Sequence, residues 1–254
     1  MNETKKIRSL FTVKDKIQLT PHMIRVIFHL SDEHVELLAG VRAGSNNKLF
    51  VPQKKNDKEM GDMVMRTYTN RVIDFVNREL WIDFVAHGEN GPAGTWAMHA
   101  VPGDMLEVGM KESVRPLVPE AKSYLLVGDA TALPVIRAIL EQLPAATEVE
   151  VIMEVHGTAD EAYLADMNDT RIHWLHNPEP EQGSKLAEVV ERYDILNTDP
   201  SRFVYVAAEY NTAKVLREYF RGIANREASS MYITSYWKAG EAEDESSARR
   251  KEDK

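Results

Sequence analysis

The stretch Arg66-Thr67-Tyr68-Thr69-Asn70-Arg71 decides how the first half of this chain folds, together with the downstream stretch Asp83-Phe84-Val85-Ala86-His87-Gly88-Glu89-Asn90-Gly91-Pro92-Ala93-Gly94-Thr95-Trp96-Ala97. The first stretch places a cation, an aromatic ring and a hydroxyl on an extended segment, at Arg66, Tyr68 and Thr69. Such a segment offers a charge to a pyrophosphate, a flat face to a ring system and a hydrogen bond to the edge of that ring.

The second stretch predicts an anion cradle. Gly91, Pro92, Ala93 and Gly94 form a turn with small side chains, and we expect a helix to begin at Thr95. Free backbone N–H groups and the helix dipole at such a point attract phosphate oxygens. Either stretch alone is a weak signal, but together they predict a site for a flavin dinucleotide.

Composition limits the possible functions. The 254 residues suffice for two modest domains, and the net charge of -9 argues against a nucleic-acid partner, which clustered Lys and Arg would bind. The absence of cysteine excludes disulfides, thiolate nucleophiles and cysteine-ligated iron–sulfur clusters. No apolar segment follows Met1-Asn2-Glu3-Thr4-Lys5-Lys6, and no charge-free run reaches the ~18 residues that span a bilayer, so we expect no membrane insertion and a cytoplasmic location.

Residues 1–119 are expected to form an antiparallel β-barrel domain. β-Branched and aromatic residues dominate short segments that turn residues separate. The expected strands are 10–18, 23–30, 48–51, 64–74, 79–86 and 105–108. Residues 53–62, rich in Lys, Asp and Asn, are expected to be a solvated loop.

Residues 120–240 are expected to form a parallel α/β domain. The apolar run Tyr124-Leu125-Leu126-Val127 ends at Gly128-Asp129, and helical spacing follows over 130–143. Further expected strands are 149–155, 171–175, 203–207 and 231–236, with helices near 162 and over 185–193 and 212–224. The charged residues 241–254 form a tail.

The turn Gly128-Asp129-Ala130-Thr131-Ala132 stands where a doubly wound fold binds a dinucleotide. Asp129 and Thr131 are therefore candidate contacts to NADH or NADPH. The full G-x-G-x-x-G signature is missing, and a tight turn without any ligand explains these residues about as well. At the end of the second strand, Glu154 is placed to accept from ribose hydroxyls and to repel a 2′-phosphate, which favours NADH.

Five ordered blocks of the chain resemble the siderophore-interacting protein family, the flavin-dependent ferric-siderophore reductases. The blocks are Arg66-x-Tyr68-Thr69-x-Arg71, Asp83-Phe84-Val85-x-His87-Gly88 with Gly91-Pro92-Ala93-x-x-Trp96-Ala97, Pro102-Gly103-Asp104, Gly128-Asp129-x-Thr131-Ala132-Leu133-Pro134 and Tyr236-Trp237-Lys238-x-Gly240. The chain departs from the family at Gly109-Met110-Lys111-Glu112, where a Gly-Pro-Arg-Gly turn is usual, and at Ala130, where an acidic residue is common.

The resemblance implies an FAD-binding barrel and a nucleotide domain like that of ferredoxin reductases. It puts Arg66 on the pyrophosphate, Tyr68 against the isoalloxazine and Thr69, the candidate catalytic residue, near flavin N5. It puts Gly94 to Ala97 on the phosphates. The other residues expected around the cofactor are Asp83, Phe84, Val85, His87, Gly91, Pro92 and Ala93.

The resemblance also implies a ferric siderophore as substrate, bound in a basic pocket. Lys48 occupies the corresponding strand, and Arg137 and Lys238 are further candidate cations. Arg249 and Arg250 would join them if the tail were helical. Ferric catecholates and citrates are anionic, so convergent cations would offset the repulsion of an acidic protein and steer the complex.

Two other readings stay open. The chain could be a general flavin-dependent NAD(P)H oxidoreductase whose acceptor is a ferredoxin or a quinone, or a non-catalytic protein that binds an iron chelate. Reduced ferredoxin is also an alternative to a nicotinamide as electron donor. His173 and His176 flank Trp174-Leu175 but lack a common face and a carboxylate cluster, so no metal site is expected there.

Overall fold

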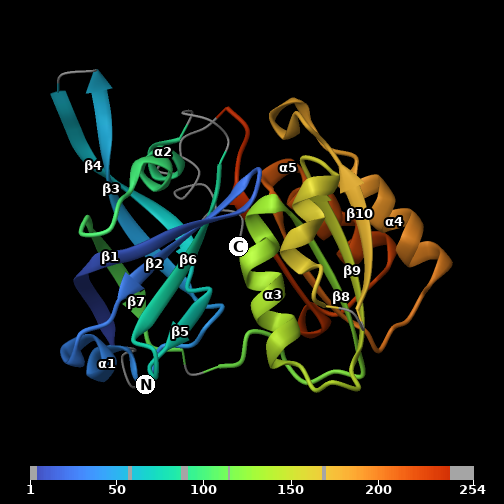
Figure 1. Ribbon diagram of the computed structural model, residues 1–254. Coiled ribbons are helices and arrows are strands. Elements are labelled where there is room, and N and C mark those ends of the chain that lie inside the picture. The colour runs from blue at the N-terminus through green and yellow to red at the C-terminus, as the bar shows by residue number, and fades with distance from the viewer. Residues whose placement is uncertain (1–4, 57–58, 87–90, 114, 168–169, 241–254) are drawn as a thin grey trace. The chain divides into compact units, whose positions relative to one another are not determined.

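A computed structural model describes residues 5–56, 59–86, 91–113, 115–167 and 170–240 of the chain (Figure 1). The chain divides into two compact units, Met1–Leu117 and Val118–Lys254. The first contains an antiparallel sheet and the second a parallel sheet with helices, so the predicted fold class is confirmed. The tail 241–254 lies outside the described residues.

The first unit is a seven-stranded antiparallel sheet in the order β4-β3-β7-β1-β2-β6-β5. Two short helices, α1 and α2, accompany it (Figure 1). The elements are β1 (Lys6–Thr20), β2 (Met23–His29), α1 (Asp32–Leu38), β3 (Asn46–Asn56), β4 (Glu59–Thr69), β5 (Val72–Asp74), β6 (Glu79–Val85), α2 (Pro92–His99) and β7 (Met105–Lys111).

Alternating side chains of these strands build the core of the first unit. In β1, for example, Ile7, Phe11 and Val13 are buried while Arg8, Leu10 and Lys14 are exposed. Alternation is blurred in β2, where five of seven side chains are buried, because α2 packs against that strand. A strand covered on both faces no longer needs a polar side.

Two expectations for the first unit were wrong, and one helix was missed. Residues 53–56 and 59–62 belong to strands and not to a loop, because β3 and β4 pair there, with Lys54 opposite Met60. Backbone groups make this ladder, so charged side chains do not prevent it. The expected strand 64–74 is two strands, β4 and β5. Helix α1 was not expected, and Ser31 starts it with a capping box in which His34 is the partner.

The second unit is a five-stranded parallel sheet in the order β10-β9-β8-β11-β12. Its strands are β8 (Ser123–Asp129), β9 (Glu148–Val155), β10 (Arg171–His176), β11 (Phe203–Glu209) and β12 (Met231–Trp237). The connecting helices are η2 (Ala130–Ala132), α3 (Leu133–Gln142), η3 (Thr158–Leu164), η4 (Pro180–Gln182), α4 (Leu186–Leu196), α5 (Tyr210–Glu218), the π-helical turn η5 (Tyr219–Ile223) and η6 (Ala228–Ser230).

The strand order reverses between β8 and β11, which are neighbours in the sheet. Helices α4 and α5 pack together on one face, where Leu186, Val190 and Leu216 meet Val127 and Val206. Helix α3 packs on β8 as well, and its buried side includes Leu133, Pro134, Val135, Ile136, Ala138 and Ile139. The carboxyl ends of β8 and β11 thus form the topological switch point of a doubly wound sheet.

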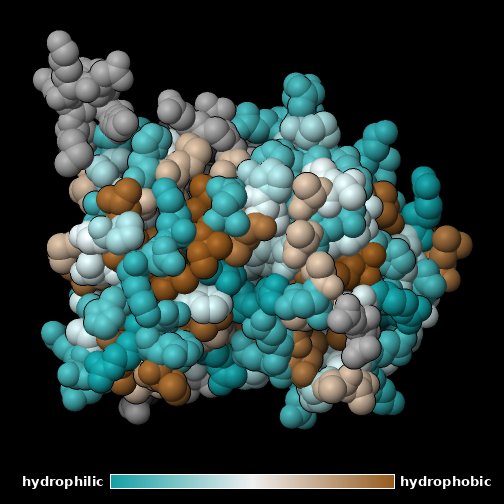
Figure 2. Space-filling view, viewed as in Figure 1, coloured by the Kyte–Doolittle hydropathy of each residue, from teal (hydrophilic) through white to brown (hydrophobic). Residues whose placement is uncertain are grey.

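Hydrophilic side chains dominate the surface visible in Figure 2, and apolar side chains lie among them in small groups. Mixed surfaces of this kind are ordinary for folded proteins. Across the described residues, no helix combines the length and apolar character needed to cross a membrane.

Candidate functional site

The end of β4 carries the cation, ring and hydroxyl that the sequence singled out. Arg66 is half-buried, and its Nη1 donates a hydrogen bond to the carbonyl of Met65 at 2.9 Å. The half-buried Tyr68 ring lies 4.6 Å from the Phe84 ring, centroid to centroid. Thr69 is buried at the last position of the strand. Pairing with β3, which places Thr69 opposite Asn46, holds this segment extended.

Asparagine side chains brace the chain directly after Thr69. Asn47 Nδ2 donates to Asn70 Oδ1 at 2.8 Å, and Asn70 Nδ2 donates to Ser45 Oγ at 3.1 Å. Asn47 and Asn70 are both buried. The strand end is therefore fixed by side-chain bonds in addition to the ladder.

Asp83 is committed to a buried ion pair. Its two carboxylate oxygens accept from Arg25 Nε at 2.7 Å and Arg25 Nη2 at 2.8 Å, and the guanidinium lies 4.4 Å from the Trp81 ring centroid. Arg25 and Asp83 face each other across β2 and β6. Sequence reasoning missed Arg25, although an arginine inside an apolar strand signals a buried acidic partner. Asp83 thus stabilises the pairing of β6 with β2 through its ion pair with Arg25.

Helix α2 begins at Pro92, three residues earlier than expected, and Thr95 N already donates to the Gly91 carbonyl at 2.9 Å. Proline is favoured at this first position because it has no N–H to satisfy. Gly91 is the N-cap and supplies no side-chain cap, and the first turn contains no acidic residue. Within residues 91–99, the start of α2 therefore presents a positive dipole end with no acidic side chain in its first turn.

Helix α2 is anchored to the core of the first unit by small and aromatic side chains. Ala93 and Ala97 are buried, and the Trp96 ring stacks on Phe28 at 6.2 Å with an interplanar angle of 6°. A Cβ on Gly94 would lie 3.2 Å from the carbonyl of Val85, the last residue of β6, so this glycine permits the close approach. Phe84 is fully buried beneath Tyr68 and Trp96.

These residues fit a flavin dinucleotide. The first unit offers a cation and a half-buried ring on β4, and a helix start at α2 that is held on the same core as the Tyr68 ring. Arg66 and the first turn of α2 would hold the pyrophosphate, and Tyr68 would hold the ring system. His87 lies outside the described residues.

Lys48 lies on β3 opposite Thr67 of β4 and Gly109 of β7. Its side chain is half-buried, and its Nζ donates to Thr67 Oγ1. Lys48 therefore pairs with Thr67, the residue that follows Arg66 on β4.

In the second unit, Gly128 is required by packing. A Cβ at this position would lie 2.5 Å from Ala132 Cβ and 3.0 Å from Ile136 Cδ1. The glycine thus lets the β8 turn and α3 close onto the sheet. This packing role is met without any ligand.

Asp129, the next residue, is buried and surrounded by donors. Its Oδ1 accepts from Thr131 N at 2.9 Å and Thr131 Oγ1 at 2.5 Å, and its Oδ2 accepts from Glu209 N and Trp237 Nε1, both at 2.8 Å. Burial raises the pKa of Asp129, and these hydrogen bonds oppose the rise. Sequence reasoning named Asp129 and Thr131 but missed Glu209, the last residue of the neighbouring strand β11.

Glu154 is buried at the carboxyl end of β9. Its oxygens accept from Ser184 Oγ at 2.6 Å and Asn177 Nδ2 at 3.2 Å. Burial raises the pKa of Glu154, and the two hydrogen bonds oppose the rise. The Glu154 carboxylate, which was expected to accept from a ribose, thus already accepts hydrogen bonds from Ser184 and Asn177.

The other two candidate cations, Arg137 and Lys238, lie in the second unit and have close partners. Arg137 donates to Glu141 at 3.1 Å, to Asp166 at 2.6 Å and to the Tyr163 carbonyl at 2.5 Å, so two carboxylates offset its charge. Lys238 lies with its Nζ 4.9 Å from the centroid of the Tyr210 ring. Arg249 and Arg250 lie outside the described residues.

The histidines of β10 have different partners. His173 Nε2 lies 3.0 Å from Glu150 Oε2, and His176 Nε2 lies 2.8 Å from Glu161 Oε1.

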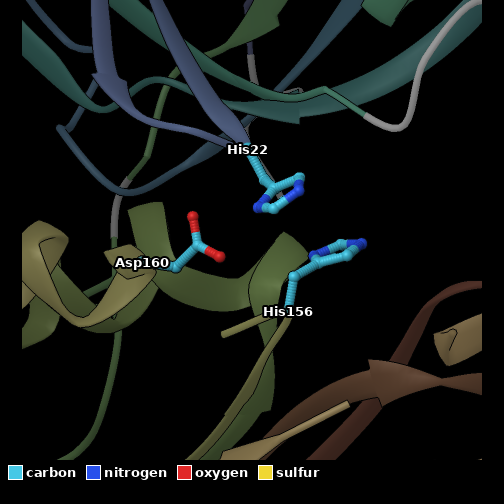
Figure 3. Close-up of side chains that lie close together, drawn as sticks. All are labelled: His22, His156 and Asp160. Carbon is cyan, nitrogen blue, oxygen red and sulfur yellow. The ribbon is translucent and has the colours of Figure 1, made fainter. Parts of the chain in front are cut away.

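Figure 3 draws two further side chains of the second unit, His156 and Asp160, with His22 of the first unit. Asp160 Oδ2 accepts from Gly157 N at 3.3 Å and so caps the start of η3.

Comparison with known proteins matches both units. A family model described as a siderophore-interacting FAD-binding domain matches residues 12–111, and one described as siderophore-interacting protein matches residues 121–240. The ferric vibriobactin reductase ViuB of Vibrio cholerae serotype O1 is 29% identical over 214 residues, which cover 79% of each chain.

Solved structures agree in fold. The siderophore-interacting protein SipS from Aeromonas hydrophila superposes with a TM-score of 0.79 at 27% identity, covering 96% of this chain and 97% of that one. A ferredoxin NADP+ reductase from Neisseria gonorrhoeae shares the fold at 13% identity, with a TM-score of 0.64 and coverage of 90% and 98%. The matched family model indicates that the first unit is an FAD-binding domain. With both units matched by its models, the chain belongs to the siderophore-interacting protein family.

Proposed function

We propose that this protein is a cytoplasmic ferric-siderophore reductase that uses FAD to pass electrons from NADH, NADPH or ferredoxin to an Fe(III) chelate. The observation that carries the proposal is the proposed cofactor cradle of the first unit, formed by Arg66, Tyr68 and the start of α2. Its occurrence in a chain similar to a ferric vibriobactin reductase supports a ferric chelate as acceptor.

The residues of the first unit bind and orient. Arg66 offers a charge to the pyrophosphate, and Phe84 supports the Tyr68 ring from below. Thr69, fixed at the end of β4 by its pairing, is proposed to hydrogen-bond the flavin N5 edge. When bound, FAD supplies the step from a two-electron donor to a one-electron acceptor, so one hydride serves two Fe(III) ions.

The protein needs no side-chain acid or base to release the iron. Hard siderophore oxygens hold Fe(III) more tightly than Fe(II), so reduction alone loosens the complex. The task left to the protein is to attract an anionic chelate despite a net charge of -9. Lys48, Arg137 and Lys238 are the proposed cations, and Glu141 and Asp166 already pair with Arg137.

The donor preference follows from Glu154. The carboxylate would repel a 2′-phosphate, so NADH is proposed over NADPH, and it would have to exchange its bonds to Ser184 and Asn177 for a ribose contact. Comparing kcat/KM for the two nicotinamides checks this preference, and a higher value with NADPH would reverse it.

Lys48→Ala tests the acceptor site. The variant should weaken binding of an anionic ferric catecholate while FAD content and reduction by the donor stay unchanged. The loss should shrink as salt rises, since exposed charges are screened over about 10 Å at ~0.1 M. The matched control is Lys111→Ala, which removes an exposed lysine at the end of β7. Equal flavin reoxidation rates for wild type and Lys48→Ala at low salt would remove Lys48 from the site.

A non-catalytic chelate-binding protein is the second candidate. Steady-state turnover separates the two, because a binding protein would take up the chelate without forming Fe(II). A general reductase would reduce quinones or ferredoxin as fast as ferric chelates, and its rate would not respond to Lys48→Ala.

A further inference from the structure

Two acidic residues end neighbouring strands at the switch point of the parallel sheet. Asp129 ends β8 and Glu209 ends the neighbouring strand β11. Both side chains are buried, and Glu209 N donates to Asp129 Oδ2 at 2.8 Å. A buried acid must be satisfied by donors or a cation, so its partners reveal its role.

Asp129 holds the end of β12. Trp237 Nε1 donates to Asp129 Oδ2 at 2.8 Å, across 108 residues of sequence. The partners that the structure gives Asp129 within the described part of the chain are neutral N–H and O–H groups. The carboxylate therefore ties three segments together, namely the β8 turn, the β11 end and the Trp237 ring.

Glu209 holds the same segment two residues later. It caps α5 through Asn211 N at 2.5 Å and Thr212 N at 3.3 Å, and its Oε1 accepts from Ala239 N at 3.3 Å. The chain is thus anchored on both sides of Lys238, at Trp237 and at Ala239. The Lys238 ammonium itself lies 4.9 Å from the ring of Tyr210, the residue after Glu209.

We propose that Asp129 and Glu209 are positioning residues that clamp Trp237–Ala239 and so present Lys238 as a preorganised cation for the anionic ferric chelate. The inference rests on the proposed function and assigns a specificity role to two buried residues that act through Lys238. Fixing the backbone on both sides of a lysine removes part of the ordering entropy that chelate binding would otherwise cost.

Trp237→Phe is the sharpest variant, because it removes the Nε1–H that Asp129 accepts while keeping an aromatic ring. The probe is the gallium(III) complex of a tris-catecholate, an anion that is not reduced, titrated against FAD-loaded protein. Lys238→Gln should raise its Kd about fivefold, the upper range for an accessible charge contact. Trp237→Phe should raise it about threefold, and FAD content should not change.

A double-mutant cycle separates positioning from loss of structure. If Trp237 acts through Lys238, Trp237→Phe should have no further effect in the Lys238→Gln background. Glu209→Gln, which keeps an acceptor for Ala239 N, should bind the complex better than Glu209→Ala. Binding of a neutral gallium(III) hydroxamate should stay the same in every variant. Lys214→Gln, an exposed lysine on α5, is the matched control.

Two outcomes would overturn the inference. One is additive losses in the cycle, and the other is a Lys238→Gln variant that binds the catecholate as tightly as wild type. In both, the wild type would still reduce ferric chelates, so the proposed function would survive. A wild type that binds the gallium complex but never reduces ferric chelates would instead refute the proposed function.

Discussion

At the scale of single residues, the buried Arg25–Asp83 ion pair is costly to break. Arg25→Ala would remove the guanidinium that pairs with the buried Asp83 carboxylate, and removing one member of a buried ion pair costs about 3–5 kcal/mol. We expect urea unfolding to show a decrease of that size in the free energy of unfolding. The double variant Arg25→Met with Asp83→Leu should recover most of it, since an apolar pair leaves no buried charge.

The exposed Arg8–Glu107 pair is the control for this prediction. Its two hydrogen bonds are also 2.7 Å long, but Arg8 is exposed, so solvent screens the attraction. Arg8→Ala should therefore cost much less than Arg25→Ala. Equal losses for the two variants would contradict the view that burial makes the Asp83 pair structural.

Gly128→Ala makes a steric prediction. The new Cβ would meet Ala132 Cβ at 2.5 Å and the carbonyl of Ala207 at 3.1 Å, so the β8 turn must shift. Overpacking of this kind costs about 1–3 kcal/mol. Gly222→Ala is the control, because nothing lies within 4 Å of its Cβ position and helical glycine is unfavourable. A Gly128→Ala protein as stable as wild type would show that the turn is not tightly packed.

At the scale of elements, β-branched and apolar runs predicted most strands, because burial decides where such runs go. Every strand expected in the parallel sheet is present within two residues of its predicted ends. The outer part of β3 and β4 could not be predicted, because backbone pairing such as that of Lys54 with Met60 leaves no hydrophobic pattern in the sequence.

The candidate site was predicted unevenly for a similar reason. Local motifs singled out Arg66, Tyr68 and the α2 start, because the residues that form them are close in sequence, and their contacts to FAD stay a prediction. Other contacts join residues far apart in sequence. Arg25 and Asp83 are separated by 58 residues, and Asp129 and Trp237 by 108, and only the strand order brings each pair together. Polar contacts between distant residues depend on the order of strands in each sheet, and the sequence of one segment does not predict that order.

The loop between α4 and β11 makes a pH prediction. Asp199 accepts from Ser123 Oγ at 2.6 Å and from Ser201, and these hydrogen bonds lower the pKa of Asp199 to about 2. A carboxyl pKa lower in the folded than in the unfolded state stabilises the fold above the ordinary pKa of 3.8. This contribution is lost as the pH falls through about 2.

The check is acid unfolding of Asp199→Asn. Wild type should lose more stability between pH 4 and pH 2 than the variant, as followed by urea titration at about those two values. Glu120→Gln, at an exposed carboxylate, should retain the wild-type slope. Identical slopes for wild type and Asp199→Asn would show that the Ser123 bond does not matter for acid stability.

At the scale of the whole molecule, two units of different architecture serve one proposed reaction. The antiparallel unit supplies the cofactor cradle, and the parallel unit supplies the buried acids that hold Lys238. The family of the chain and its FAD-binding domain are established by similarity, whereas the passage of electrons to a ferric chelate is the central claim.

Anaerobic single turnover tests that claim most directly. FAD-loaded protein is photoreduced and mixed with a ferric tris-catecholate, while flavin absorbance and trapped Fe(II) are followed together. The account predicts that the oxidised flavin spectrum returns and that about two Fe(II) ions form per FAD, because each iron takes one electron. Reduced protein that keeps its electrons and forms no Fe(II) in the presence of the chelate would contradict it.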